Sequence, residues 1–148
     1  MIDKILVAID GSQNSYKALD FALDLAEKYN AQVLVLNVFQ LPAISKVPDE
    51  PLAYSGSDAA FFQDLKKIHE ETLAKAVSKA KSLKPRLVIS SELKEGEPAL
   101  QIVSVAKEGG FDVIVVGHKG ESRMKEILLG GTCEKVAHSA DCSVIIVK

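Results

Sequence analysis

Hydrophobic residues along the chain gather in five short runs that are rich in β-branched side chains. Several of these runs are continuously apolar, which is typical of strands buried on both faces of a parallel sheet. The third run is more polar, so we expect it near an edge of the sheet. The five predicted strands are Lys4–Ile9, Gln32–Phe39, Arg86–Leu93, Asp112–Val116 and Ser143–Val147.

Between the strands, apolar residues recur at the spacing of a helix. In the first such segment they run from Ala18 to Tyr29, and Ser12 or Asn14 supplies the N-cap. Proline is permitted in the first turn of a helix, and glycine commonly ends one. The other predicted helices cover about Asp58–Leu83, the stretch from Gly96-Glu97-Pro98 to Gly109-Gly110, and about Gly130–Ser139.

Strands that alternate with helices require right-handed crossovers, and they therefore predict a doubly wound α/β fold with helices on both faces of an open parallel sheet. The 148 residues suffice for one domain, 1–148, and are too few for two. One irregular stretch, Gln40–Ser57, contains three prolines. We expect a surface loop there, which is either a lid or a plain connector.

Composition narrows the classes of partner. The hydrophobic content of 47% and the charged content of 26% match globular proteins. A net charge of −2 gives no electrostatic attraction to nucleic acid or to an anionic membrane, so neither is an expected partner. The apolar run Ile5–Ile9 is too short for a signal peptide, and we expect a cytoplasmic protein. In a reducing compartment, Cys133 and Cys142 are expected to be buried thiols.

Glycines after the fourth strand suggest a phosphate site. Gly117 and Gly120 lie in the turn, and Gly130-Gly131-Thr132 opens the last helix. Glycine lets backbone N–H groups approach a ligand closely, and the start of a helix offers unpaired N–H donors to an anion. The Thr132 hydroxyl adds a donor. Taken separately, each glycine pair also fits an ordinary turn or helix boundary, and the two common phosphate-binding fingerprints, G-x-G-x-x-G and G-x-x-x-x-G-K-[ST], are absent.

Neighbouring side chains leave alternatives open. His118, Lys119 and Arg123 either reach phosphate oxygens or are solvated. Cys133 either lines the pocket or packs in the core. Two further histidines, at positions 69 and 138, are expected on helix surfaces without a function.

The end of the first strand carries an acidic residue, Asp10, followed by Gly11 and Ser12. In doubly wound sheets, ligands bind beyond the carboxyl ends of the strands, where the strand order reverses. If the first and fourth strands flank that point, Asp10 faces the Gly117 turn. It then binds a ribose hydroxyl or the Mg²⁺ that accompanies ATP. Alternatively, Asp10 caps the first helix.

No catalytic set emerges from the motifs. The chain contains no Ser-His-Asp order, no H-E-x-x-H and no C-x-x-C. We therefore assign no catalytic residue. Slow ATP hydrolysis is an alternative function, because positioning and electrostatics supply much of the catalysis in phosphoryl transfer.

Several motifs, in this order, resemble the universal stress protein family over essentially the whole chain. Residues 5–12 match its opening strand followed by Asp-Gly-Ser, and Gly96-Glu97-Pro98 matches its Gly-x-Pro turn. The ATP-binding members share G-x2-G-x9-G-[ST], which is similar to Gly117-x2-Gly120-x9-Gly130 here. Gly131 stands where the family has Ser or Thr, and Thr132 follows one place later.

The resemblance implies a Rossmann-like five-stranded sheet in the order 3-2-1-4-5 and a homodimer. It also implies an ATP-binding stress-response or regulatory module in which the nucleotide modulates a protein-interaction surface. A dimeric interaction protein that binds no nucleotide is a further alternative. The resemblance places adenosine at Ala8, Asp10 and Val38, and phosphates at Gly117, Gly120, Gly130 and Gly131.

The same strand order makes the apolar run Val144–Val147 an edge strand. An exposed apolar edge invites pairing with another chain. A two-fold axis satisfies the unpaired backbone groups of both copies at once. We therefore expect the homodimer to form through this strand.

Overall fold

The computed structural model describes residues 1–41, 56–118 and 131–148. Its five strands form one parallel sheet in the order β3-β2-β1-β4-β5, which confirms the expected doubly wound α/β fold. The irregular stretch predicted at 40–57 lies mostly outside the described residues. The elements are β1 (Lys4–Ala8), α1 (Gln13–Tyr29), β2 (Gln32–Phe39), α2 (Gly56–Leu83), β3 (Ile89–Glu95), α3 (Pro98–Gly109), β4 (Val113–Gly117), α4 (Gly131–Ser139) and β5 (Ser143–Val147).

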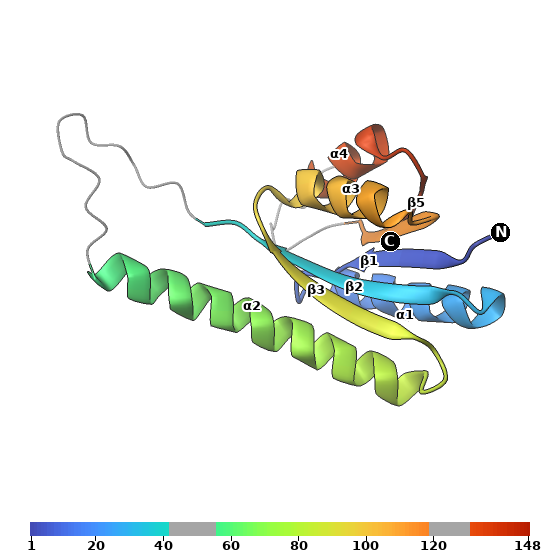
Figure 1. Ribbon diagram of the computed structural model, residues 1–148, viewed down its shortest axis with the longest axis horizontal. Helices are drawn as coiled ribbons and strands as arrows, with labels where there is room; N and C mark the ends of the chain where they lie inside the picture. The colour runs from blue at the N-terminus through green and yellow to red at the C-terminus, as the bar shows by residue number, and fades with distance from the viewer. Residues whose placement is uncertain (42–55, 119–130) are drawn as a thin grey trace.

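The sheet separates two apolar layers. Helices α1 and α2 cover one face, and α3 and α4 cover the other (Figure 1). Successive residues of a strand point to opposite faces, so Val33 and Val35 pack beneath α1 and α2, whereas Leu34 and Leu36 pack beneath α3. Burial on both faces explains why the central strands read as continuous apolar runs.

Strand ends differ from the expected ones where local hydrogen bonds intervene. The third strand begins at Ile89, three residues later than predicted, because a turn follows α2 in which Leu87 N donates to Lys84 O (3.1 Å). It is an edge strand, as its polarity suggested. The fourth begins after Asp112, whose carboxylate accepts from the backbone N–H groups of Asp3 (2.9 Å) and Lys4 (3.0 Å). These two hydrogen bonds lower the pKa of the carboxyl group.

Helix ends follow the predicted signals. Ser12 is the N-cap of α1, and its side chain accepts from Ser15 N. Gly110 adopts a left-handed conformation (φ 65°) at the end of α3, which glycine adopts without steric cost. The start of α1 and the end of α3 were predictable because Ser12 and Gly110 have strong preferences for these positions.

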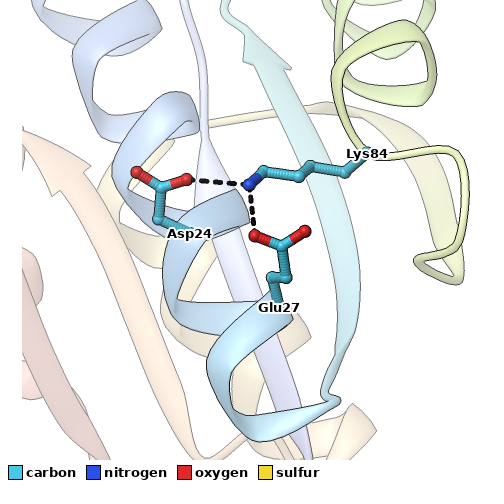
Figure 2. Close-up of polar contacts among 3 residues, drawn as sticks. All are labelled: Asp24, Glu27 and Lys84. Atoms are coloured by element: carbon cyan, nitrogen blue, oxygen red, sulfur yellow. Dashed lines mark hydrogen bonds and ion pairs between the residues drawn. The ribbon is translucent and has the colours of Figure 1, made fainter.

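An ion-pair cluster joins the end of α2 to α1. Lys84 lies 3.1 Å from Asp24 and also contacts Glu27 (Figure 2). Hydrogen bonds to these two carboxylates raise the pKa of Lys84. Both acids are largely exposed, so water screens the attraction. The cluster is therefore expected to add little to the stability of the fold.

None of the helices in the described part of the chain combines the length and hydrophobicity that crossing a membrane requires.

Candidate functional site

The site predicted from the glycines lies where the strand order reverses. Strand β1 pairs with β2 on one side and with β4 on the other. The connection that follows β1 therefore runs toward β2, whereas the connection that follows β4 runs the opposite way, toward β5. The register pairs Val7 with Val115. Continuing it by three residues brings Asp10 level with His118, beyond the carboxyl ends of both strands. Doubly wound sheets bind ligands beyond the carboxyl ends of the strands at such a point.

Asp10 is half-buried and takes part in the turn that leads into α1. Its Oδ1 atom accepts a hydrogen bond from Ser12 N at 2.9 Å. The turn requires Gly11 in the left-handed region (φ 89°). Among the described residues, nothing hydrogen-bonds to Oδ2 of Asp10. Asp10 thus shapes the helix entry through Oδ1, and its second oxygen has no protein partner among the described residues, so the two interpretations of this residue are compatible.

The end of β2 carries backbone groups that no described residue pairs. Leu36 O accepts from Ile9 N of the segment that ends β1, at 2.9 Å. Phe39 O instead accepts from Gly96 N, which follows β3, also at 2.9 Å. Backbone groups alternate in direction along a strand, so those of Val38 point toward the β1 side, like those of Leu36.

Strand β1 has already ended at that level. The N–H and C=O of Val38 therefore have no hydrogen-bond partner within the described parts of the chain. Its half-buried side chain packs on the α3 and α4 layer, as does that of Ala8. One backbone donor and one acceptor, side by side over an apolar floor, can hold a flat heterocycle by its edge.

Gly117 has a structural role that sequence reasoning missed. A Cβ atom at this position would lie 2.8 Å from the carbonyl oxygen of Asn14, in the first turn of α1. Its φ does not fall in the left-handed region. Valine at position 117 would therefore disturb the fold, because the absent side chain is what lets α1 approach the end of β4.

The backbone amide of His118 donates to Val147 O at 2.8 Å and so belongs to the sheet. This leaves the half-buried imidazole as the part of His118 that could donate to a ligand. Four other predicted site residues, Lys119, Gly120, Arg123 and Gly130, lie outside the described residues.

Helix α4 begins at Gly131, with its amino terminus on the carboxyl side of the sheet. The first N–H groups of a helix lack intrahelical partners and favour anions. Gly131 and Thr132 are exposed, and a Cβ atom at Gly131 would meet nothing within 4 Å. At α3, by contrast, the Glu97 carboxylate already accepts from the first N–H groups. The geometry therefore favours α4 over α3 as a place for phosphate.

The two cysteines are free, as expected. Cys133, on α4, is buried in the core as expected. Cys142 is only half-buried, so the expectation of a buried thiol is wrong there. Burial raises the pKa of each thiol, so both are protonated at neutral pH. The burial of Cys133 supports the interpretation that it packs in the core.

Within the described residues, no three His, Cys, Asp or Glu side chains cluster closely enough to hold a metal ion. A Mg²⁺ ion at Asp10 would therefore depend on ligand oxygens for most of its coordination.

His69 was expected on a helix surface, and this expectation is wrong. The residue is half-buried, and its Nδ1 atom lies 2.9 Å from Oδ1 of Asn37. Its ring stacks on Phe39, with centroids 5.5 Å apart. The one available signal was Asn37, a polar residue within the apolar run of β2, which requires a buried partner.

The model of the universal stress protein family matches residues 1–148, the whole chain. This chain belongs to the universal stress protein family. The universal stress protein YxiE of Bacillus subtilis is 34% identical over 150 residues and is covered completely, as is this chain. The resemblance found in the sequence motifs is thus confirmed.

Solved universal stress proteins share the fold. UspA of Lactobacillus plantarum superimposes with a TM-score of 0.83 at 21% identity, covering 99% of this chain and 98% of that one. A universal stress protein solved in complex with cAMP is 25% identical, with a TM-score of 0.73 and coverage of 99% and 97%. Some members of the family therefore bind an adenine nucleotide.

Proposed function

We propose that this universal stress protein binds ATP in the crevice between the ends of β1, β2 and β4, and that the bound nucleotide modulates a protein-interaction surface. The observation that carries the proposal is the unpaired N–H and C=O of Val38 at the point where the strand order reverses. Unpaired backbone groups at a partly buried position need a partner, and a ligand supplies it.

The polarity of this pair suits adenine. The Watson–Crick edge of adenine offers an acceptor, N1, beside a donor, the N6 amino group. The Val38 N–H and C=O complement both. Guanine presents the reverse order, an acceptor at O6 and a donor at N1, so it cannot take the same position. A site built to hydrogen-bond one pattern leaves groups unpaired with the other, which is costly.

The remaining groups fit the rest of the nucleotide. Oδ2 of Asp10 is placed to accept from a ribose hydroxyl or to hold Mg²⁺ with the phosphates. The N–H groups at the start of α4, with Gly131 and Thr132, are suited to phosphate oxygens. Gly117, Gly120 and Gly130 complete the proposed site by family resemblance, and His118, Lys119 and Arg123 join it because they lie near these glycines in the sequence.

Calorimetric titration of the purified protein tests the proposal. ATP is expected to bind at least about tenfold more tightly than GTP, because GTP leaves the Val38 groups mispaired. Release of adenine nucleotide from the protein as purified, seen by absorbance after precipitation, is an independent check. Equal affinities for the two nucleotides, or no binding of either, contradict the proposal.

We also propose that the protein is a homodimer through β5. This strand is at the edge of the sheet, and Val144–Val147 are all half-exposed. Apolar side chains on an unpaired edge favour association with a second copy. Light scattering at micromolar concentration is expected to give twice the mass of the chain, and Ile145→Lys to shift it toward the monomer. A monomer for the unmodified protein refutes the dimer.

A further inference from the structure

An amide is buried within the apolar layer beneath α1 and α2. Asn37 is 0% exposed and lies on the face of β2 that also carries Val33 and Val35. Its Nδ2 atom has no hydrogen-bond partner among the described residues. A polar side chain there is costly unless it is hydrogen-bonded. Leucine would fill the same volume without that cost, so filling the core does not explain asparagine here.

The contact that holds this amide comes from α2. Oδ1 of Asn37 accepts from Nδ1 of His69 at 2.9 Å. The same imidazole stacks on Phe39, at an interplanar angle of 28°. The His69 side chain of α2 thus contacts the residues immediately before and after Val38.

The backbone N–H and C=O of Val38 point toward the β1 side, into the proposed nucleotide site. On the β1 side, no described residue is hydrogen-bonded to the strand at this level. Its last residues are paired with β3 on the other side, where Val38 lies opposite Lys94. The second restraint on their orientation is the contact with α2. A shift of Asn37 or Phe39 would turn the Val38 edge that is proposed to receive adenine.

We propose that His69 is a positioning residue for nucleotide binding, which orients the Val38 edge chiefly through its hydrogen bond to Asn37. This inference rests on the proposed function, and it makes α2 the element whose position is coupled to binding of the base. The helix that carries His69 extends past the end of the sheet in Figure 1, and two residues of its first half, Phe61 and Ile68, are 54% and 58% exposed. Binding at Val38 therefore favours one placement of α2, and that placement favours binding, because coupling is reciprocal.

A matched pair of variants isolates the hydrogen bond. His69→Asn keeps a donor near the position of Nδ1, whereas His69→Leu has the same branched shape without a donor. Ile68→Ala, at the exposed neighbouring position of α2, is the control. Urea unfolding of each variant establishes that it is folded before binding is measured.

The readout compares ATP with inorganic tripolyphosphate, which lacks the base, by displacement of a fluorescent ATP analogue. We expect His69→Leu to weaken ATP binding about fivefold to tenfold and to leave tripolyphosphate binding unchanged, because only the base meets Val38. His69→Asn is expected to stay within about twofold of the unmodified protein for both ligands. Ile68→Ala is expected to change neither.

Equal losses for ATP and tripolyphosphate in His69→Leu indicate general loosening and overturn the positioning role. Unchanged ATP affinity in His69→Leu overturns it as well. If this variant does not fold, His69→Phe, which keeps the ring on Phe39, replaces it with the same expectations. An unmodified protein that binds no ATP refutes the proposed function first, and the role of His69 with it, whereas normal ATP binding in a His69 variant refutes that role alone.

Discussion

Gly117→Val is expected to lower the free energy of unfolding by about 3 kcal/mol, the cost of forcing extra volume into a packed site. The new Cβ would lie 2.8 Å from the Asn14 carbonyl oxygen, which is backbone and cannot rotate away. Relief requires α1 to move off β4, and α1 contributes Ala18, Leu19 and Ala22 to the core. Valine has a favourable strand propensity, but that benefit is smaller than this cost.

Urea unfolding followed by circular dichroism measures the change. Gly131→Ser is the control, because a side chain at Gly131 meets open space and should leave stability nearly unchanged. A Gly117→Val protein as stable as the unmodified one would show that α1 does not approach β4 so closely. Because the variant disturbs the fold, its loss of nucleotide binding would not locate the phosphate, and added bulk at Gly131 is the better probe.

Val38→Pro is expected to weaken ATP binding by more than about tenfold, since proline removes the N–H that adenine N1 would use and leaves that base atom unpaired. The fold should tolerate the change. The N–H of Val38 has no partner in the described residues, and proline is accepted in strands where the N–H is outside the ladder. The residue before it, Asn37, already has the extended conformation that proline favours in its predecessor.

Val38→Ala is the matched control, because it trims the same side chain and keeps the N–H. Calorimetry with ATP compares the two, and urea unfolding confirms that both are folded. We expect the alanine variant to bind ATP within a few-fold of the unmodified protein. Tight ATP binding by the proline variant would move the base away from β2. Loss of affinity in both variants alike would mean that the side chain of Val38 matters and its backbone does not.

The elements of the fold were predictable from sequence because their signals are local. Continuous apolar runs identified the strands, and two of them, Gln32–Phe39 and Ser143–Val147, have the predicted bounds. The N-cap at Ser12 and the helix stop at Gly110 follow from backbone preferences of single residues. Bounds shifted where a partner far away in the sequence intervened, as Asp3 and Lys4 do at Asp112.

The candidate site was predictable in outline for a related reason. A strand followed by Asp-Gly-Ser and a strand followed by glycines end on the same side of any parallel sheet, so Asp10 and Gly117 were expected together if these two strands are neighbours. The pairing of β1 with β4 meets that condition. Family motifs then indicated the nucleotide. Both inferences depend on chain direction and strand order, and the rules for connecting strands allow only a few such orders.

Tertiary structure alone decided how individual residues act. Asn14 contacts Gly117 because α1 crosses β4, a contact between segments about a hundred residues apart that no periodicity encodes. Among the described residues, the backbone groups of Val38 lack partners because β1 ends three residues earlier in the register than β2. His69 looks like any polar residue on a helix until the packing of α2 turns it toward Asn37. The sequence by itself determined which elements form and in what order, because those preferences are short-range. Which atoms are left without partners depends on where each strand stops beside its neighbour, and only the assembled sheet defines that.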